Sequence, residues 1–193
     1  MEDIKSKKFY TDKELQILIQ AKNIISPKKV VYFRDIIKYD TGYDIIPMSE
    51  KLKDILIFKC EEFIKNFNKT LLNNTHSKFG WFVEDEFKKF SDFKTPKGKG
   101  YPDYELPFEI YNTSPFIENK VFNKNSLKQS LRTFYYNSSS KINRTTNHIL
   151  IGFEFKESNN KKLLTGNYHI IDLYHKKMRL RLEINCSNIE LYE

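Results

Sequence analysis

The chain has 193 residues and a mass of 23.2 kDa, with a formal net charge of +8 and a pI near 9.2. Its hydrophobic fraction of 39% and aromatic fraction of 15% exclude a disordered tail and suffice for one folded domain. No apolar run reaches the roughly 18 residues of a transmembrane helix, and the first residues lack a signal-peptide core, so a cytoplasmic protein without membrane association is expected. Two cysteines, Cys60 and Cys186, are too few for a disulfide framework or a cysteine zinc site.

The positive net charge favours an acidic partner such as nucleic acid. A protein that neutralises several phosphates gains affinity because counterions are released, whatever the base sequence. The alternative is that a lysine-rich and asparagine-rich composition reflects only an AT-rich genome. Charge by itself therefore permits DNA binding without establishing it.

The N-terminal part of the chain, residues 1–94, is expected to be mainly helical. Thr11 or Asp12 can cap a first helix. A short strand is expected at residues 29–33, whereas residues 34–39 fit a strand or a helix equally well.

The clearest helix is expected to begin after Ser49 and to end near Phe67. Its apolar side chains recur with the i, i+3, i+4 spacing that places them on one buried stripe. A shorter helix is expected at residues 81–90, and the glycine- and lysine-rich residues 91–100 connect it to the strands that follow.

Residues 95–193 are expected to supply the sheet. The run from His148 to Phe155 is apolar, as is typical of a strand buried on both faces, whereas residues 177–186 alternate between apolar and polar side chains. A helix is expected at residues 124–136. These elements predict an α/β fold, with residues 1–193 as a single domain and a mixed central sheet of about five strands flanked by helices. The expected strands cover residues 101–111, 115–122, 148–155, 167–174 and 177–186.

Two acids and a lysine lie in consecutive predicted strands. Asp103 follows Pro102 in the first strand, and Glu118 precedes Lys120 by two residues in the second. Because side chains alternate along a strand, Glu118 and Lys120 point to the same face, and on adjacent strands the two carboxylates can converge on one cation. A small set of hard oxygen ligands suits Mg²⁺, which keeps several waters. The alternative is that Asp103 only starts a turn and that the other two residues form a solvated strand face.

A rival triplet with the same spacing, Glu154-Phe155-Lys156, ends the strand that begins at His148. The earlier triplet is favoured because Asp103 and Glu118 fit a hairpin-like step between neighbouring strands, whereas Glu154 lies beyond a predicted helix.

The order Pro102-Asp103 followed by Glu118-Asn119-Lys120 resembles the PD-(D/E)xK signature of type II restriction endonucleases. The glycine-rich approach at residues 95–103 is similar to the segment that precedes the first acid in many of these enzymes. Further blocks at residues 130–153 and 170–192 resemble the same enzymes in the same order, so the likeness covers roughly residues 95–193.

This resemblance implies a restriction-endonuclease-like fold and a Mg²⁺-dependent enzyme that hydrolyses both strands of double-stranded DNA at a short specific site. Asp103, Glu118 and the backbone carbonyl of Asn119 would hold the metal. Lys120 would orient or deprotonate the attacking water, or counter the developing negative charge. Palindromic DNA presents equal sites on its two strands, so a homodimer is expected, and no organic cofactor is implied.

In the families resembled, the segment after the catalytic lysine tends to lie near DNA. Arg132, Lys141 and Arg144 are therefore candidate contacts to phosphates or guanine edges. The alternative is a helix end whose aromatic side chains are core and whose cations are solvated. His148, at the start of a buried strand, is interpreted as a core histidine and not as a metal ligand.

An extra carboxylate often reaches such sites from a neighbouring helix, and Glu61 and Glu62 are the candidates on the helix after Ser49. Helical geometry places both at the edges of its apolar stripe, which favours ordinary solvated glutamates.

Two other functions remain open for this sequence. One is a repair, recombination or phage nuclease of the same fold, and the other is a non-catalytic nucleic-acid-binding protein that uses its basic, aromatic-rich surface.

Overall fold

The chain forms two compact units, one of Tyr32–Lys176 and the other of Met1–Val31 with Lys177–Glu193. In the described part of the chain, no helix is long and apolar enough to cross a membrane. The computed structural model describes residues 30–70, 79–98, 100–107, 114–125, 141–158 and 161–179, together with Thr11, Lys13, Glu14, Gln16, Ile17, Gln20 and Tyr136.

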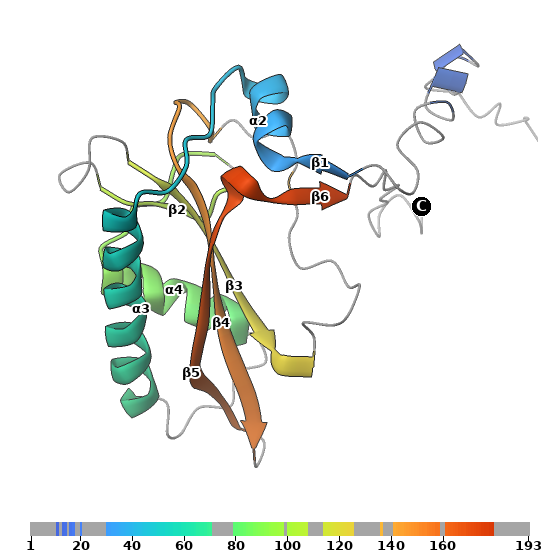
Figure 1. The fold of residues 1–193 in the computed structure, drawn as a ribbon. Helices are drawn as coiled ribbons and strands as arrows, with labels where there is room; N and C mark the ends of the chain where they lie inside the picture. The colour runs from blue at the N-terminus through green and yellow to red at the C-terminus, as the bar shows by residue number, and fades with distance from the viewer. Residues whose placement is uncertain are drawn as a thin grey trace, which may run out of the picture. The chain divides into compact units, whose positions relative to one another are not determined.

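A mixed four-stranded sheet in the order β2-β3-β4-β5 forms the centre of the larger unit (Figure 1). β2 (Tyr104–Glu105) is antiparallel to β3 (Phe116–Asn123). β3 is parallel to β4 (His148–Ser158), which is antiparallel to β5 (Lys161–Asp172). Parallel strands need a crossover connection, and most of this one, including residues 126–135 of the helix predicted at residues 124–136, lies outside the described residues. The predicted α/β fold with a mixed sheet is confirmed.

The described part of this sheet has four strands where about five were expected, because the chain leaves the sheet after β5. Asp172 accepts a hydrogen bond from the N–H of Tyr174 at 3.0 Å and so caps a 3₁₀ turn, η3 (Leu173–His175). The chain then continues as β6 (Lys177–Arg179), which pairs with β1 (Val30–Tyr32) in a two-stranded sheet. The rest of the strand predicted up to residue 186 lies outside the described residues.

The described helices of the larger unit are α2 (Phe33–Thr41), α3 (Glu50–Thr70) and α4 (Phe79–Ser91). The segment that fitted a strand or a helix is therefore helical. Gly42, whose φ of 78° lies in the left-handed region, ends α2 at little steric cost. Ser49 caps α3 as predicted, since its hydroxyl accepts a hydrogen bond from the N–H three residues later at 3.2 Å.

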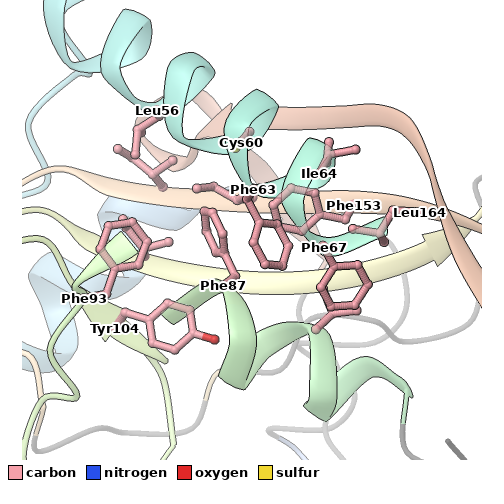
Figure 2. Packing of buried hydrophobic residues seen from close by; sticks show 14 of the residues in the cluster. Leu56, Cys60, Phe63, Ile64, Phe67, Phe87, Phe93, Tyr104, Phe153 and Leu164 are labelled. Carbon is pink, nitrogen blue, oxygen red and sulfur yellow. The ribbon is translucent and has the colours of Figure 1, made fainter. Parts of the chain in front are cut away.

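Side chains from α3 and α4 meet one face of the sheet in an aromatic core (Figure 2). The rings of Phe63 on α3, Phe87 on α4 and Phe153 on β4 lie with centroids 4.9 to 5.3 Å apart. Ile117 of β3 belongs to the same core. Because side chains alternate along a strand, this packing directs Glu118 to the opposite face of the sheet.

A second packed cluster lies on that opposite face, where β3 and β4 begin. Phe33 of α2, Tyr101, Phe116 and His148 are all buried, and their contacting ring centroids lie 5.2 to 6.3 Å apart. Since Tyr101 is two residues before Asp103, this cluster anchors the segment that carries the first predicted acid.

Candidate active site

The pairing of β2 with β3 brings the two predicted acids together. Tyr104 pairs with Ile117 in antiparallel register. Continuing this register by one residue places Asp103 opposite Glu118, on the face of the sheet that does not carry the α3–α4 core. The step between neighbouring strands that the sequence indicated is therefore present in the structure.

Three side chains converge at this point. The Nζ of Lys120 lies 2.6 Å from Oε1 of Glu118 and 3.6 Å from Oδ2 of Asp103. The same Asp103 oxygen accepts a hydrogen bond from the backbone N–H of Asn119 at 2.9 Å. Two acids and one amine thus form a compact group beside β3, just beyond the two residues of β3 that pair with β2.

Glu118 is the most buried member of this group, with a side chain 6% exposed. Burial raises the pKa of its carboxyl, and the negative charge of Asp103 raises it further, while the charge and hydrogen bond of Lys120 oppose the shift. Its Oε2 is buried and has no hydrogen-bond partner in the part of the chain that the structure describes. A buried carboxylate oxygen without a donor is an acceptor available to a cation.

Lys120 is held by the two acids. Burial works against its charge, but the carboxylates of Glu118 and Asp103 outweigh burial and raise the pKa of the ammonium. In the arrangement described, Lys120 is therefore protonated at neutral pH and offers hydrogen-bond donors beside both acids.

The ligand set fits Mg²⁺. Among the described residues, no group of three or more His, Cys, Asp and Glu side chains is arranged to hold a metal. Mg²⁺ does not need such a group, because it takes one or two carboxylates and keeps several waters. The backbone of Asn119 adds an oxygen: the N–H and C=O of a strand residue point to the same side, and this N–H points to Asp103.

Glu84 on α4 is a carboxylate near this group that the sequence analysis missed. Burial raises the pKa of Glu84, the charge of Asp103 adds to the shift, and the charges of Lys120 and Lys141 oppose it. Glu84 follows the buried Val83 on the edge of the helix's apolar stripe. The helix expected at residues 81–90 carries the signal for it, because Glu84 lies on that helix, one helix further along the chain than Glu61 and Glu62.

Glu61 and Glu62, the carboxylates weighed on α3, are engaged elsewhere. Glu61 accepts a hydrogen bond from the hydroxyl of Tyr168 at 3.2 Å, and Glu62 lies 3.5 Å from the ammonium of Lys65. The structure gives both glutamates partners away from the group around Asp103.

The rival triplet lies away from Asp103. Leu150 of β4 pairs with Glu118, so Glu154 is four residues, or about 13 Å, further along the strand. β3 also lies between β4 and β2 in the strand order. The geometry therefore favours Glu118 over Glu154 as the partner of Asp103.

Two of the three candidate DNA contacts are described, and both make contacts within the protein. Arg144 donates to Glu105 at 2.7 Å and to the carbonyl of Ser114 at 2.8 Å. Lys141 is buried and donates to the carbonyl of Pro102 at 2.7 Å. Arg132 lies outside the described residues.

His148 is a buried histidine, as the sequence indicated. Its Nδ1 lies 2.8 Å from the hydroxyl of Tyr101, which links the start of β4 to the segment before Asp103. Burial lowers the pKa of the imidazole to about 3, and the charge of Arg144 adds to the shift. His148 is therefore neutral at physiological pH.

This neutral histidine predicts a specific acid sensitivity. An unfolded imidazole binds a proton below about pH 6.5, whereas the folded one resists protonation until about pH 3. The free energy of unfolding therefore falls as the pH falls from about 6.5 to about 3, by up to about 1.4 kcal/mol per pH unit. Between pH 7 and pH 5, the free energy of unfolding measured by urea denaturation should fall by about 2 kcal/mol more in the wild type than in His148→Gln. Equal losses would contradict the assignment.

Comparison with known proteins gives the family. The model of the type II restriction enzyme MjaV family matches residues 26–193. The type II restriction enzyme MjaV of Methanocaldococcus jannaschii is 29% identical over an alignment of 206 positions that covers 89% of this chain and 89% of that protein. No solved structure matches the chain. Because the family match spans most of the sequence, including residues 26–94 of the N-terminal part, the chain belongs to the type II restriction enzyme MjaV family and is a restriction endonuclease.

Proposed function

We propose that this restriction enzyme is a Mg²⁺-dependent endonuclease of the PD-(D/E)xK superfamily that cuts both strands of double-stranded DNA at a short specific site. The observation that carries the proposal is the convergence of Asp103, Glu118 and Lys120 from neighbouring strands, within 3.6 Å of the lysine Nζ. Membership of the family supports restriction activity, and the convergence of these three residues supports their assignment as the active site.

Each residue has a role that follows from its position. Asp103, Glu118 and the carbonyl of Asn119 would hold the metal, which would supply positive charge to polarise the phosphate and to make the attacking water more acidic. Lys120 orients the attacking water and donates to the phosphate oxygens on which negative charge develops. Glu84 is a further carboxylate whose charge acts on the same group.

The partner is duplex DNA, and the enzyme acts in the cytoplasm as a homodimer without an organic cofactor. A net charge of +8 favours a polyanion. One active group per chain and two strands to cut call for two chains related by a two-fold axis, one on each strand. Sedimentation of the protein with a duplex that carries one site should therefore show two chains per duplex.

Digestion of a sequenced circular plasmid tests this function. With Mg²⁺ we expect discrete fragments whose ends map to one short sequence, and no cleavage once EDTA has removed the metal. A smear of random fragments would contradict site specificity, and undiminished cleavage in EDTA would contradict the metal. Preferential cutting of nicked or branched DNA would indicate a repair or recombination nuclease instead.

A further inference from the structure

We propose that Lys141 is a positioning residue, which fixes Asp103 in its metal-binding orientation by holding the carbonyl of Pro102. This role deepens the proposed metal-dependent function and rests on it. Lys141 would thereby help to set the affinity of the site for divalent metal without touching the metal or the DNA.

The burial of Lys141 is the first observation. Its side chain is buried, with the residue 7% exposed, and its Nζ donates to the carbonyl of Pro102 at 2.7 Å. Lysine is almost never buried without partners, because taking an ammonium out of water costs several kcal/mol unless acceptors and negative charge compensate. The hydrogen bond from this buried ammonium therefore indicates that the carbonyl of Pro102 must be held in a fixed orientation.

The second observation is that the hydrogen bond from Lys141 holds the peptide unit between Pro102 and Asp103. The carbonyl of Pro102 belongs to the planar peptide unit that ends in the nitrogen of Asp103, so fixing this oxygen fixes the plane from which Asp103 departs. At its other end, the Asp103 carboxylate accepts a hydrogen bond from the N–H of Asn119 at 2.9 Å. Lys141 constrains the backbone of Asp103 and Asn119 constrains its side chain.

The charges around the site are consistent with this role. Asp103 and Glu118 both lie beside Lys120, and the charge of Asp103 also acts on Glu84 of α4. Burial and the charge of Asp103 raise the pKa of Glu84, and the charges of Lys120 and Lys141 oppose that rise. The positive charge of Lys141 therefore acts on the same acidic region as that of Lys120.

These contacts favour a different role from the DNA contact suggested by sequence. A lysine that grips a phosphate needs an ammonium that the duplex can reach, whereas this one is buried against the main chain. The two roles differ in what the substitution changes. Loss of a phosphate contact weakens DNA binding and lowers its salt dependence, whereas loss of a positioning contact weakens metal binding.

The experiment compares Lys141→Met with wild type, using Mn²⁺ as the probe and electron paramagnetic resonance to count free ion in the absence of DNA. We expect Mn²⁺ affinity to fall roughly 10- to 100-fold in Lys141→Met, the range seen when groups that orient metal ligands are removed. Lys141→Arg, which keeps the charge and the donors, should recover part of the loss. Lys124→Met removes an exposed lysine and should bind Mn²⁺ like wild type.

DNA binding is measured in parallel, without divalent metal and over a range of salt concentrations. The inference predicts that Lys141→Met keeps the wild-type slope of log Kd against log salt. Wild-type Mn²⁺ affinity in Lys141→Met, or a slope reduced by about one, would overturn it. Where Lys141→Met does not fold, Lys141→Gln, which keeps a donor and loses the charge, takes its place and must show the same weakened Mn²⁺ binding.

Glu118→Gln separates failure of this inference from failure of the proposed function. If wild type and Glu118→Gln bind Mn²⁺ equally, the proposed metal site itself is wrong, and the role of Lys141 falls with it. If Glu118→Gln loses Mn²⁺ while Lys141→Met keeps it, the metal site stands and only the positioning role is refuted.

Discussion

Glu118→Gln is expected to abolish cleavage while leaving DNA binding intact. Glutamine keeps the shape of the side chain but removes the negative charge that the metal requires. Several kcal/mol of transition-state stabilisation depend on that metal, so the single-turnover cleavage rate should fall on the order of 10³-fold or more. Binding to the same duplex, measured by gel shift without divalent metal, should remain within a few-fold of wild type, because Glu118 is largely buried.

Glu154→Gln is the matched control for this prediction. Glu154 is followed two residues later by a lysine, as Glu118 is, but it lies on β4 and accepts a hydrogen bond from the side-chain amide of Asn167 at 3.4 Å. Its substitution should leave the cleavage rate unchanged. An active Glu118→Gln together with an inactive Glu154→Gln would move the catalytic assignment to the second triplet.

Lys120→Met is expected to lower the cleavage rate roughly 10²- to 10³-fold, the usual cost of removing one donor that stabilises transition-state charge. Metal binding should survive or become tighter, because the ammonium that lies 2.6 Å from Glu118 no longer competes for its carboxylate. Cleavage rates at saturating Mg²⁺ and Mn²⁺ affinities without DNA measure the two effects separately. This combination, slower chemistry with undiminished metal affinity, distinguishes Lys120 from a residue that only supports the metal ligands.

Lys156→Met, in the second triplet, provides the comparison for Lys120. The side chain of Lys156 is exposed, so its loss should change the cleavage rate little. A Lys120→Met enzyme that cleaves at the wild-type rate, with only weaker and less salt-dependent DNA binding, would show that Lys120 grips phosphate and takes no part in the chemistry.

The central pair of strands could be predicted because local rules determine it. Asp103 and Glu118 lie in apolar stretches separated by one short connection, and such stretches tend to pair as neighbours. Alternation along the strand then places Lys120 beside Glu118. The helix after Ser49 could be predicted for the same reason, since both its N-cap residue and the spacing of its apolar residues lie within its own stretch of sequence.

Other features depend on contacts that no local pattern carries. The sequence marks Lys141 and Arg144 as cations, and their partners, Pro102 and Glu105, are 39 residues away in each case. The departure of the chain from the sheet at Asp172 likewise depends on distant contacts, since that carboxylate also accepts a hydrogen bond from the N–H of Met48 at 2.9 Å. Tertiary packing therefore decides which charges face solvent and where the sheet ends.

A crystal structure of the enzyme with Mn²⁺ and a cognate duplex, with the metal located by its anomalous scattering, tests the catalytic assignment most directly. The ion should lie between the carboxylates of Asp103 and Glu118, within about 2.2 Å of an oxygen of each, with Lys120 beside the scissile phosphate. An ion bound at Glu154, or no ion between the two acids while the crystal cleaves its DNA, would contradict it.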